Sequence, residues 1–276
     1  MVTRNVSDQS STSNQQGHET IKLRVLGCSG GQIPGHNLSS YLLNDSLLID
    51  AGSTTSALNI DEQEKIENIL VTHAHLDHVM NLATLSDNLF DRHSGVINVW
   101  GIADTISALS TSFFNEVIWP DFTKITSDDR PAPVIALREL PEDEPVSIAG
   151  MSVTAISVSH SVPGSGFLIE KDGRIILHIG DTGPTEKIWQ AARSREELSA
   201  VFVEASFPNR LKVLASDSGH LTPETLADEL AKLARPSVPV YVTHLKPLYR
   251  DEIIAELNEV KDYRLILLND GDVIEI

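Results

Sequence analysis

The chain has 276 residues and only one cysteine, Cys28, so it cannot form an internal disulfide bond. That content is typical of a reducing compartment. A single thiol also excludes the cluster of thiolates that holds many structural zinc ions. Any metal ion must therefore be held by histidine and carboxylate side chains.

Positive charge is scarce as well. Lys and Arg number 21 against 39 Asp and Glu, which gives a formal net charge of −18. A field of that sign repels polyanions, so we expect neither a nucleic-acid polymer nor an anionic membrane as a partner. A small anionic substrate is less affected, because bound metal ions can reverse the local potential. Most of the acidic excess is interpreted as solvated surface.

Long hydrophobic runs are also missing. No apolar stretch is long enough to span a bilayer, and the N-terminus has none of signal-peptide length. Residues 1–20 are rich in Ser, Gln, Asn and Thr, which predicts a disordered tail before a single domain over residues 21–276. We therefore expect a soluble, cytoplasmic protein. A hydrophobic content of 41% and this length allow a sizeable core.

Strands and helices are predicted from alternating and periodic apolar residues. Residues 128–145 are rich in Pro, Asp and Glu and predict a surface connection. Each half of the chain opens with strands and then mixes strands with helices, which two packed sheets with outer helices would satisfy. The predicted strands are 21–27, 39–43, 47–51, 69–72, 96–100, 151–159, 166–170, 174–179, 200–204, 238–243 and 264–268, and the helices are 61–68, 102–113, 185–193, 222–234 and 251–260.

The densest group of reactive side chains follows the predicted strand 69–72 and reads His73-Ala74-His75-Leu76-Asp77-His78. Side chains alternate on an extended segment, so His73, His75 and Asp77 are predicted to point the same way. A turn into a helix would then move His78 to a neighbouring position. Imidazole and carboxylate suit zinc, manganese or iron. A chance cluster on a solvated loop is the alternative, but this order directly after a strand favours a metal site.

This run matches the His-x-His-x-Asp-His signature, and the chain resembles the metallo-β-lactamase superfamily. The resemblance implies an α/β fold, an αββα sandwich of two mixed sheets packed face to face with helices outside. It also implies two divalent metal ions, most readily Zn²⁺, with Mn²⁺ or Fe²⁺ as alternatives. His73, His75 and a later His would hold one metal ion, while Asp77, His78 and a final His would hold the other. The later motifs supply His160 as the third ligand of the first ion, Asp181 as a bridging carboxylate and His244 as the last ligand.

Four segments resemble the class II cyclic-nucleotide phosphodiesterases in particular. That resemblance implies hydrolysis of 3′,5′-cyclic nucleotides, cyclic AMP or cyclic GMP, to nucleoside 5′-monophosphates, and allows a homodimer. The chain departs from it at Asn81 and Asp87, on the helix expected after the metal loop, which concerns substrate preference and not the fold. The four segments are His-Leu-Asp-His with Ser86 downstream, residues 114–120, residues 204–208, and residues 218–223 followed by Thr-His-Leu-Lys-Pro.

Five further residues have proposed roles. His220 would protonate the leaving oxygen and Glu204 would orient it, since a carboxylate beside an imidazole fixes its tautomer and raises its basicity. The alternative is that His220 only caps the following helix. Asp77 is counted as catalytic as well as metal-binding. Asp50 resembles the family Asp that hydrogen-bonds the metal loop without being a ligand. Lys246 would contact the substrate phosphate, unless it is merely solvated.

Two other functions fit the same residues. One is a ribonuclease Z-like phosphodiesterase that acts on RNA 3′ ends. That branch usually carries a long Gly/Pro-rich arm, and this sequence has no such basic or glycine-rich insertion. The other is a non-catalytic metal-binding module on the same fold. A degenerate binder should have lost at least one ligand, and here none is missing.

Overall fold

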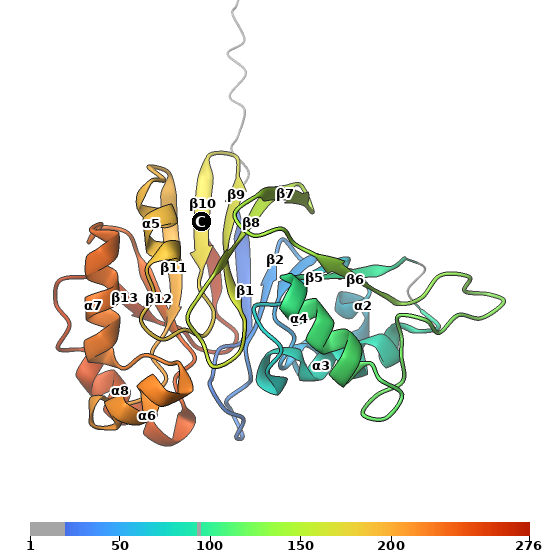
Figure 1. Cartoon of the computed structure of the whole chain (residues 1–276), viewed down its shortest axis with the longest axis horizontal. Coiled ribbons are helices and arrows are strands. Elements are labelled where there is room, and N and C mark those ends of the chain that lie inside the picture. The colour runs from blue at the N-terminus through green and yellow to red at the C-terminus, as the bar shows by residue number, and fades with distance from the viewer. Residues whose placement is uncertain (1–19, 93–94) are drawn as a thin grey trace, which may run out of the picture.

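The computed structural model describes residues 20–92 and 95–276, and two seven-stranded sheets form its centre (Figure 1). The tail expected over residues 1–20 lies outside the described residues apart from Thr20. The first sheet has the order β14-β1-β2-β3-β4-β5-β6, and the second has the order β13-β12-β11-β10-β9-β8-β7. In the first sheet the strands are β14 (Val273–Glu275), β1 (Lys22–Gly27), β2 (Ser40–Leu43), β3 (Leu47–Ile49), β4 (Asn68–Leu70), β5 (Ile97–Gly101) and β6 (Ile135–Glu139). In the second they are β13 (Leu265–Leu267), β12 (Val240–Thr243), β11 (Leu198–Glu204), β10 (Arg174–His178), β9 (Ser165–Lys171), β8 (Met151–Ser157) and β7 (Pro145–Ile148).

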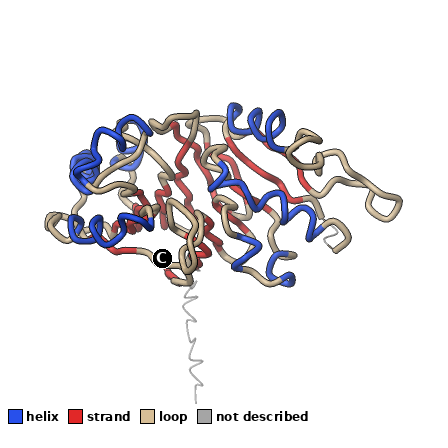
Figure 2. The backbone as a smooth tube through the Cα atoms, turned by 90° about the horizontal axis from the view of Figure 1, so that it is seen from below, coloured by secondary structure: helices blue, strands red, loops and turns tan. Residues whose placement is uncertain are grey.

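Helices cover the outer face of each sheet, as the view from below shows (Figure 2). Beside the first sheet are α1 (Thr54–Ala57), α2 (Ile60–Gln63), α3 (Leu76–Leu89), α4 (Ala103–Ala108) and the π-helical turn η1 (Leu109–Phe113). Beside the second are α5 (Lys187–Arg193), α6 (Lys212–Ser218), α7 (Pro223–Leu233) and α8 (Arg250–Leu257), with the 3₁₀ turns η2 (Asn209–Leu211) and η3 (Pro247–Tyr249). None of the helices in the described ranges has both the length and the apolar character to cross a bilayer.

Three apolar clusters fill the spaces between the layers, and the two-residue period of the strands decides which side chain enters which cluster. In β2, Tyr41 and Leu43 lie in the cluster between the two sheets, whereas Leu42 faces the helices beside the first sheet. The helices α5, α7 and α8 enclose the third cluster against the second sheet. The predicted αββα sandwich is therefore confirmed.

Some predicted elements were wrong. The helix expected over 61–68 is only the short α2, because Asn68 already pairs with β3 and β5 as the first residue of β4. The surface connection expected over 128–145 contains β6, an edge strand that pairs with β5 in parallel. The helix expected over 102–113 changes to π geometry at Leu109. The strands β7 and β14 and the helix α6 were not predicted.

Strand ends place the reactive residues at one edge of the sandwich. The His73 run follows β4, Asp181 follows β10, Glu204 ends β11 and His244 follows β12. The strands β3, β4, β5 and β6 are parallel to one another, as are β10, β11 and β12, so their carboxyl ends share an edge. Loops from both sheets meet there, which is where open α/β sheets commonly bind ligands.

Candidate metal centre

Four overlapping groups of possible metal ligands form at this edge, and two of them together contain all the predicted ligands. The ligand atoms of His73, His75 and His160 lie within 4.8 Å of one another. Those of a second group lie within the same distance and comprise Asp77, His78, Asp181 and His244. The two groups are the same two sets that the sequence predicted. All seven predicted ligands are therefore brought together, four from the segment that follows β4 and three from loops of the second sheet.

The local path of the loop differs from the predicted one. His75 is the N-cap of α3, and Asp77 lies in the first turn of that helix. The prediction that His73, His75 and Asp77 lie on one extended segment was therefore wrong. The helical turn instead separates Asp77 and His78 from the first group. One segment of the chain therefore still contributes ligands to two neighbouring sites.

The first group consists of imidazole rings that converge on each other. The Nε2 atoms of His73 and His160 both lie 3.1 Å from Nδ1 of His75. Burial lowers the pKa of each of these three rings, and in each the neighbouring imidazoles lower it further. All three therefore favour the neutral form, which is the form that binds a metal ion.

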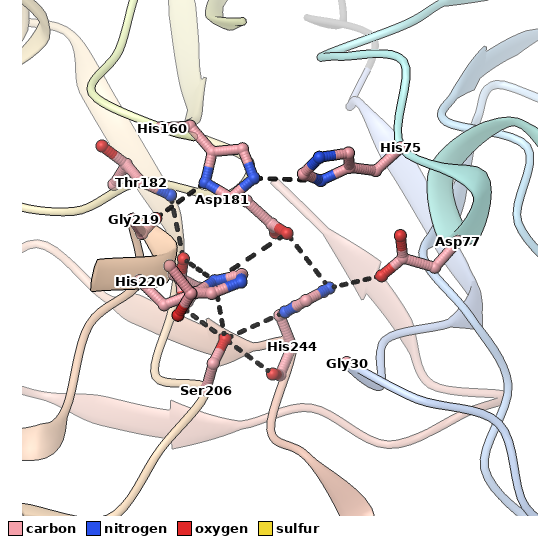
Figure 3. A network of polar contacts seen from close by, with 12 residues as sticks. Gly30, His75, Asp77, His160, Asp181, Thr182, Ser206, Gly219, His220 and His244 are labelled. Carbon is pink, nitrogen blue, oxygen red and sulfur yellow. Dashed lines mark hydrogen bonds and ion pairs between the residues drawn. The ribbon is translucent and has the colours of Figure 1, made fainter. Parts of the chain in front are cut away.

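The second group brings two carboxylates against two imidazoles, and Figure 3 shows Asp77 and Asp181 on either side of His244. The Nε2 atom of His244 lies 3.3 Å from both Asp77 Oδ2 and Asp181 Oδ2, and His78 Nε2 lies 3.3 Å from Asp181 Oδ2. The same Asp181 oxygen is 3.9 Å from His73 Nε2 in the first group. Asp181 therefore stands between the two groups, where a bridging carboxylate would stand.

The environment of His78 tests whether a cation fits. Burial opposes a charge on this ring, but Asp181 and Asp50 raise its pKa well above its usual value. The surroundings thus stabilise a positive charge at a buried position. In addition, His78 Nε2 is buried and has no hydrogen-bond partner among the described residues. Both features, with a donor set of imidazoles and carboxylates, fit divalent metal ions.

Outer contacts fix the orientation of the rings. Asp50 Oδ2 accepts a hydrogen bond of 2.7 Å from His78 Nδ1, and the same carboxylate accepts bonds from the amide and hydroxyl of Thr72. Asp50 therefore lies against the metal loop and is not among the seven ligand candidates, as predicted. The Nδ1 atom of His160 lies 2.7 Å from the carbonyl oxygen of Gly219. Such partners set which nitrogen of an imidazole faces a metal ion.

Glu204 and His220 form a buried pair next to the metal groups. The distance from His220 Nδ1 to Glu204 Oε1 is 2.8 Å, and Glu204 is fully buried. Burial opposes the imidazolium, but the charge and hydrogen bond of Glu204, with the charge of Asp181, outweigh it and raise the pKa of His220. Helix α7 is capped instead by Thr222, whose side chain accepts from the amide of Thr225. The helix-cap alternative for His220 is therefore wrong.

Comparison with known proteins agrees with this geometry. Residues 46–245 match the family described as the beta-lactamase superfamily domain. The chain belongs to this superfamily. It is 28% identical to a protein of Yersinia pestis named "Probable 3′,5′-cyclic-nucleotide phosphodiesterase", over 90% of this chain and 87% of that protein. It is 24% identical to a protein of Archaeoglobus fulgidus named "Ribonuclease Z", over 87% of this chain and 92% of that protein.

Solved structures of the superfamily show the same fold. The structure described as unliganded yeast PDE1 superposes with a TM-score of 0.78 at 19% identity, covering 92% of this chain and 99% of that one. The short form of human tRNase Z superposes with a TM-score of 0.65, also at 19% identity, covering 92% and 98%. These two likenesses show the fold, while the similar sequences include proteins named as cyclic-nucleotide phosphodiesterases and as Ribonuclease Z.

Lys246 is fixed at the rim of the site. Its Nζ atom donates to the carbonyl oxygen of Gly30 at 3.1 Å and lies 5.1 Å from the centre of the Phe207 ring. The alternative that Lys246 is merely solvated is therefore wrong, and its contact with a phosphate stays a prediction. Gly30 itself admits no larger residue, because an added Cβ would lie 2.6 Å from the carbonyl oxygen of His244.

Three residues of the site were missed from the sequence: Ser206, Thr182 and Gly219. Each lies one or two residues from a predicted site residue, namely Glu204, Asp181 and His220. Their contacts use a small hydroxyl or a backbone group, which no spacing rule singles out. A search of positions within two residues of the predicted site residues would have found them.

Proposed function

We propose that this protein is a phosphodiesterase that uses two divalent metal ions to hydrolyse 3′,5′-cyclic nucleotides to nucleoside 5′-monophosphates. The observation that carries the proposal is the buried Glu204–His220 pair beside the two groups of metal-ligand candidates. A metal-binding module has no need of a positioned proton donor, whereas hydrolysis of an alkyl phosphodiester does. The names and coverage of the similar phosphodiesterases support the substrate class.

His73, His75 and His160 would hold one metal ion, and Asp77, His78 and His244 the other, with Asp181 between them. When bound, the two ions would supply Lewis acidity at the phosphate and make a water molecule nucleophilic near neutral pH. Zinc is the ion favoured by this donor set, with Mn²⁺ or Fe²⁺ as alternatives.

His220 would complete the reaction. Its Nδ1 atom is held by Glu204, so Nε2 is the nitrogen left to donate a proton to the 3′ oxygen as that oxygen leaves phosphorus. The raised pKa of His220 keeps the proton available near neutral pH. Lys246, fixed at the rim, is proposed to approach the phosphate, and Asp77 is proposed to act in catalysis as well as in metal binding.

A substrate at RNA 3′ ends is the second candidate, favoured by the similar proteins named Ribonuclease Z. The net charge of −18 opposes it, because a polyanion would approach against a repulsive field. We therefore propose a small cyclic nucleotide as the partner and neither a nucleic-acid polymer nor a membrane. A homodimer stays a prediction.

A hydrolysis panel tests the proposal. Purified protein with Zn²⁺ or Mn²⁺ is given cyclic AMP, cyclic GMP, 2′,3′-cyclic nucleotides, a nitrophenyl phosphodiester and a precursor tRNA. We expect the 3′,5′-cyclic nucleotides to be converted to 5′-monophosphates, with little cleavage of the tRNA. Efficient tRNA cleavage without cyclic-nucleotide hydrolysis would assign the second function, and protein without bound metal would favour the non-catalytic module.

A further inference from the structure

We propose that Ser206 is a positioning residue through which Glu204, the carboxylate that orients the proton donor His220 directly, also orients the ligand candidate His244. The proposal rests on the proposed function for the roles of these two histidines. Ser206 is fully buried, and its Oγ atom lies 2.9 Å from His244 Nδ1 and 3.3 Å from His220 Nδ1 while donating to Glu204 Oε2 (Figure 3). The Ser206 hydroxyl therefore links the Glu204–His220 pair to His244 of the second metal group.

The hydrogen bonds of Glu204 determine the direction of this contact. Its Oε1 atom accepts from the amide of Thr182 at 2.8 Å and from His220 Nδ1 at 2.8 Å. Its Oε2 atom accepts from Ser206 Oγ and from the amide of Leu221 at 3.3 Å. Four donors fill the lone pairs of the two carboxylate oxygens, which leaves no place for a carboxyl proton.

Ser206 has one hydroxyl hydrogen, and Glu204 takes it. The carbonyl oxygen of His244, 3.1 Å away, is the weaker alternative, because a bond to a charged acceptor is stronger. Ser206 Oγ must then accept from His244 Nδ1, so that nitrogen carries the proton. The bare Nε2 atom of His244 faces Asp77 and Asp181 at 3.3 Å each, on the side of the second metal group.

The first sheet contains the same arrangement. Asp50, which follows β3, holds His78 Nδ1 directly at 2.7 Å and accepts from the Thr72 hydroxyl at 2.9 Å. That hydroxyl in turn lies 3.1 Å from His73 Nδ1. Each sheet thus provides one buried carboxylate that serves one imidazole directly and a second through a hydroxyl. Because the pattern occurs twice from unrelated segments, we infer that Ser206 and Thr72 act as equivalent positioning residues.

The test measures tautomers and metal affinity in the full-length protein with zinc as the probe. Two-bond ¹H–¹⁵N spectra of the zinc-loaded wild type should show His244 with the proton on Nδ1. Ser206→Ala should weaken zinc binding, measured by competition with a chelator, by about 10–100-fold at one of the two sites, the usual effect of losing an outer partner of a metal-bound histidine. Thr72→Val should weaken the other site, as shown by the ring signals of His73.

Matched variants separate positioning from general packing. Ser165→Ala removes the hydroxyl of another fully buried serine, one whose Oγ has no hydrogen-bond partner among the described residues, and should leave both zinc affinities unchanged. Ser206→Thr, which keeps the hydroxyl, should restore most of the affinity lost in Ser206→Ala. Equal loss in Ser165→Ala and Ser206→Ala, or two unchanged zinc affinities in Ser206→Ala, would overturn the proposal.

The wild-type spectrum tests which nitrogen of His244 carries the proton even if Ser206→Ala does not fold. A proton on Nε2 of His244 in the zinc-loaded wild type would refute the assignment directly. None of these measurements requires a substrate. A protein that binds zinc as described but hydrolyses no cyclic nucleotide would refute the proposed function and leave the role of Ser206 intact.

Discussion

Replacing His178 by Phe should make the protein more resistant to acid. His178 ends β10 between the two sheets, where its ring stacks on Phe202 at 6.1 Å and meets Tyr41 edge-on at 4.8 Å. It is 2% exposed, and neither ring nitrogen has a hydrogen-bond partner among the described residues. A phenyl ring of similar shape would fill the same place without polar atoms.

The size of the effect follows from the pKa of His178, which burial lowers from 6.5 to about 4. The charges of Asp50 and Asp181 act against this shift, and that of His78 adds to it. Since the unfolded chain takes up the proton first, the free energy of unfolding falls as the pH drops from about 6.5 towards 4. At about 1.4 kcal/mol per pH unit, this histidine removes about 3 kcal/mol across that range.

The assay is urea unfolding of the wild type and the variant at several pH values between 4 and 8. Metal is first removed by a chelator, so that loss of metal at low pH does not change the free energy of unfolding of either protein. At neutral pH, His178→Phe should be as stable as the wild type or more so, because an unpaired buried polar group is replaced by an apolar one. The stability difference should then grow by about 3 kcal/mol in favour of the variant at pH 4. Parallel pH profiles for the two proteins would refute the reasoning.

Three further predictions concern the site and the core. His220→Ala should keep both metal ions but lower kcat on a cyclic nucleotide by about 10²–10⁴, with a smaller loss on a nitrophenyl phosphodiester, whose leaving group needs no proton; an equal loss on both would remove His220 from the catalytic residues. Asp181→Ala should abolish activity and weaken both metal sites, so two retained ions with near-normal turnover would exclude a bridging role. Glu229→Ala should lower the free energy of unfolding by about 3 kcal/mol without changing kcat in the folded protein, since it leaves the Trp189 Nε1 and Thr185 amide donors without their buried acceptor; an unchanged denaturation midpoint would contradict this.

Alternating apolar side chains predicted strand β1, but the order of the layers was implied by the resemblance to the metallo-β-lactamase superfamily. The sequence did not predict β14, whose side chains are half-exposed or exposed and carry little periodic signal. That strand exists because β1 offers a free edge, with Lys22 opposite Glu275. Pairing across the length of the chain cannot be deduced from a segment's own composition.

The seven ligand candidates were predicted because each follows a strand and belongs to a motif. The path of the loop was not, since helix α3 begins at Leu76 and not after Asp77. The histidine at N-cap gives no signal of a helix start, because it makes no capping bond. Ser206 was recognised only as part of a motif. Its role depends on which donors occupy the lone pairs of Glu204, and only the three-dimensional structure shows this.

The pairing of β1 with β14 has a mechanical consequence. Ile21 and Ile276 exchange two backbone hydrogen bonds, so force applied at these two residues would unzip the strands one bond at a time. Just before β14, Asp270 accepts bonds from the amides of Cys28 and Asn37, which flank the loop whose Gly30 carbonyl holds Lys246. Detaching β14 would therefore loosen the rim of the site while the remaining strands of both sheets are still paired.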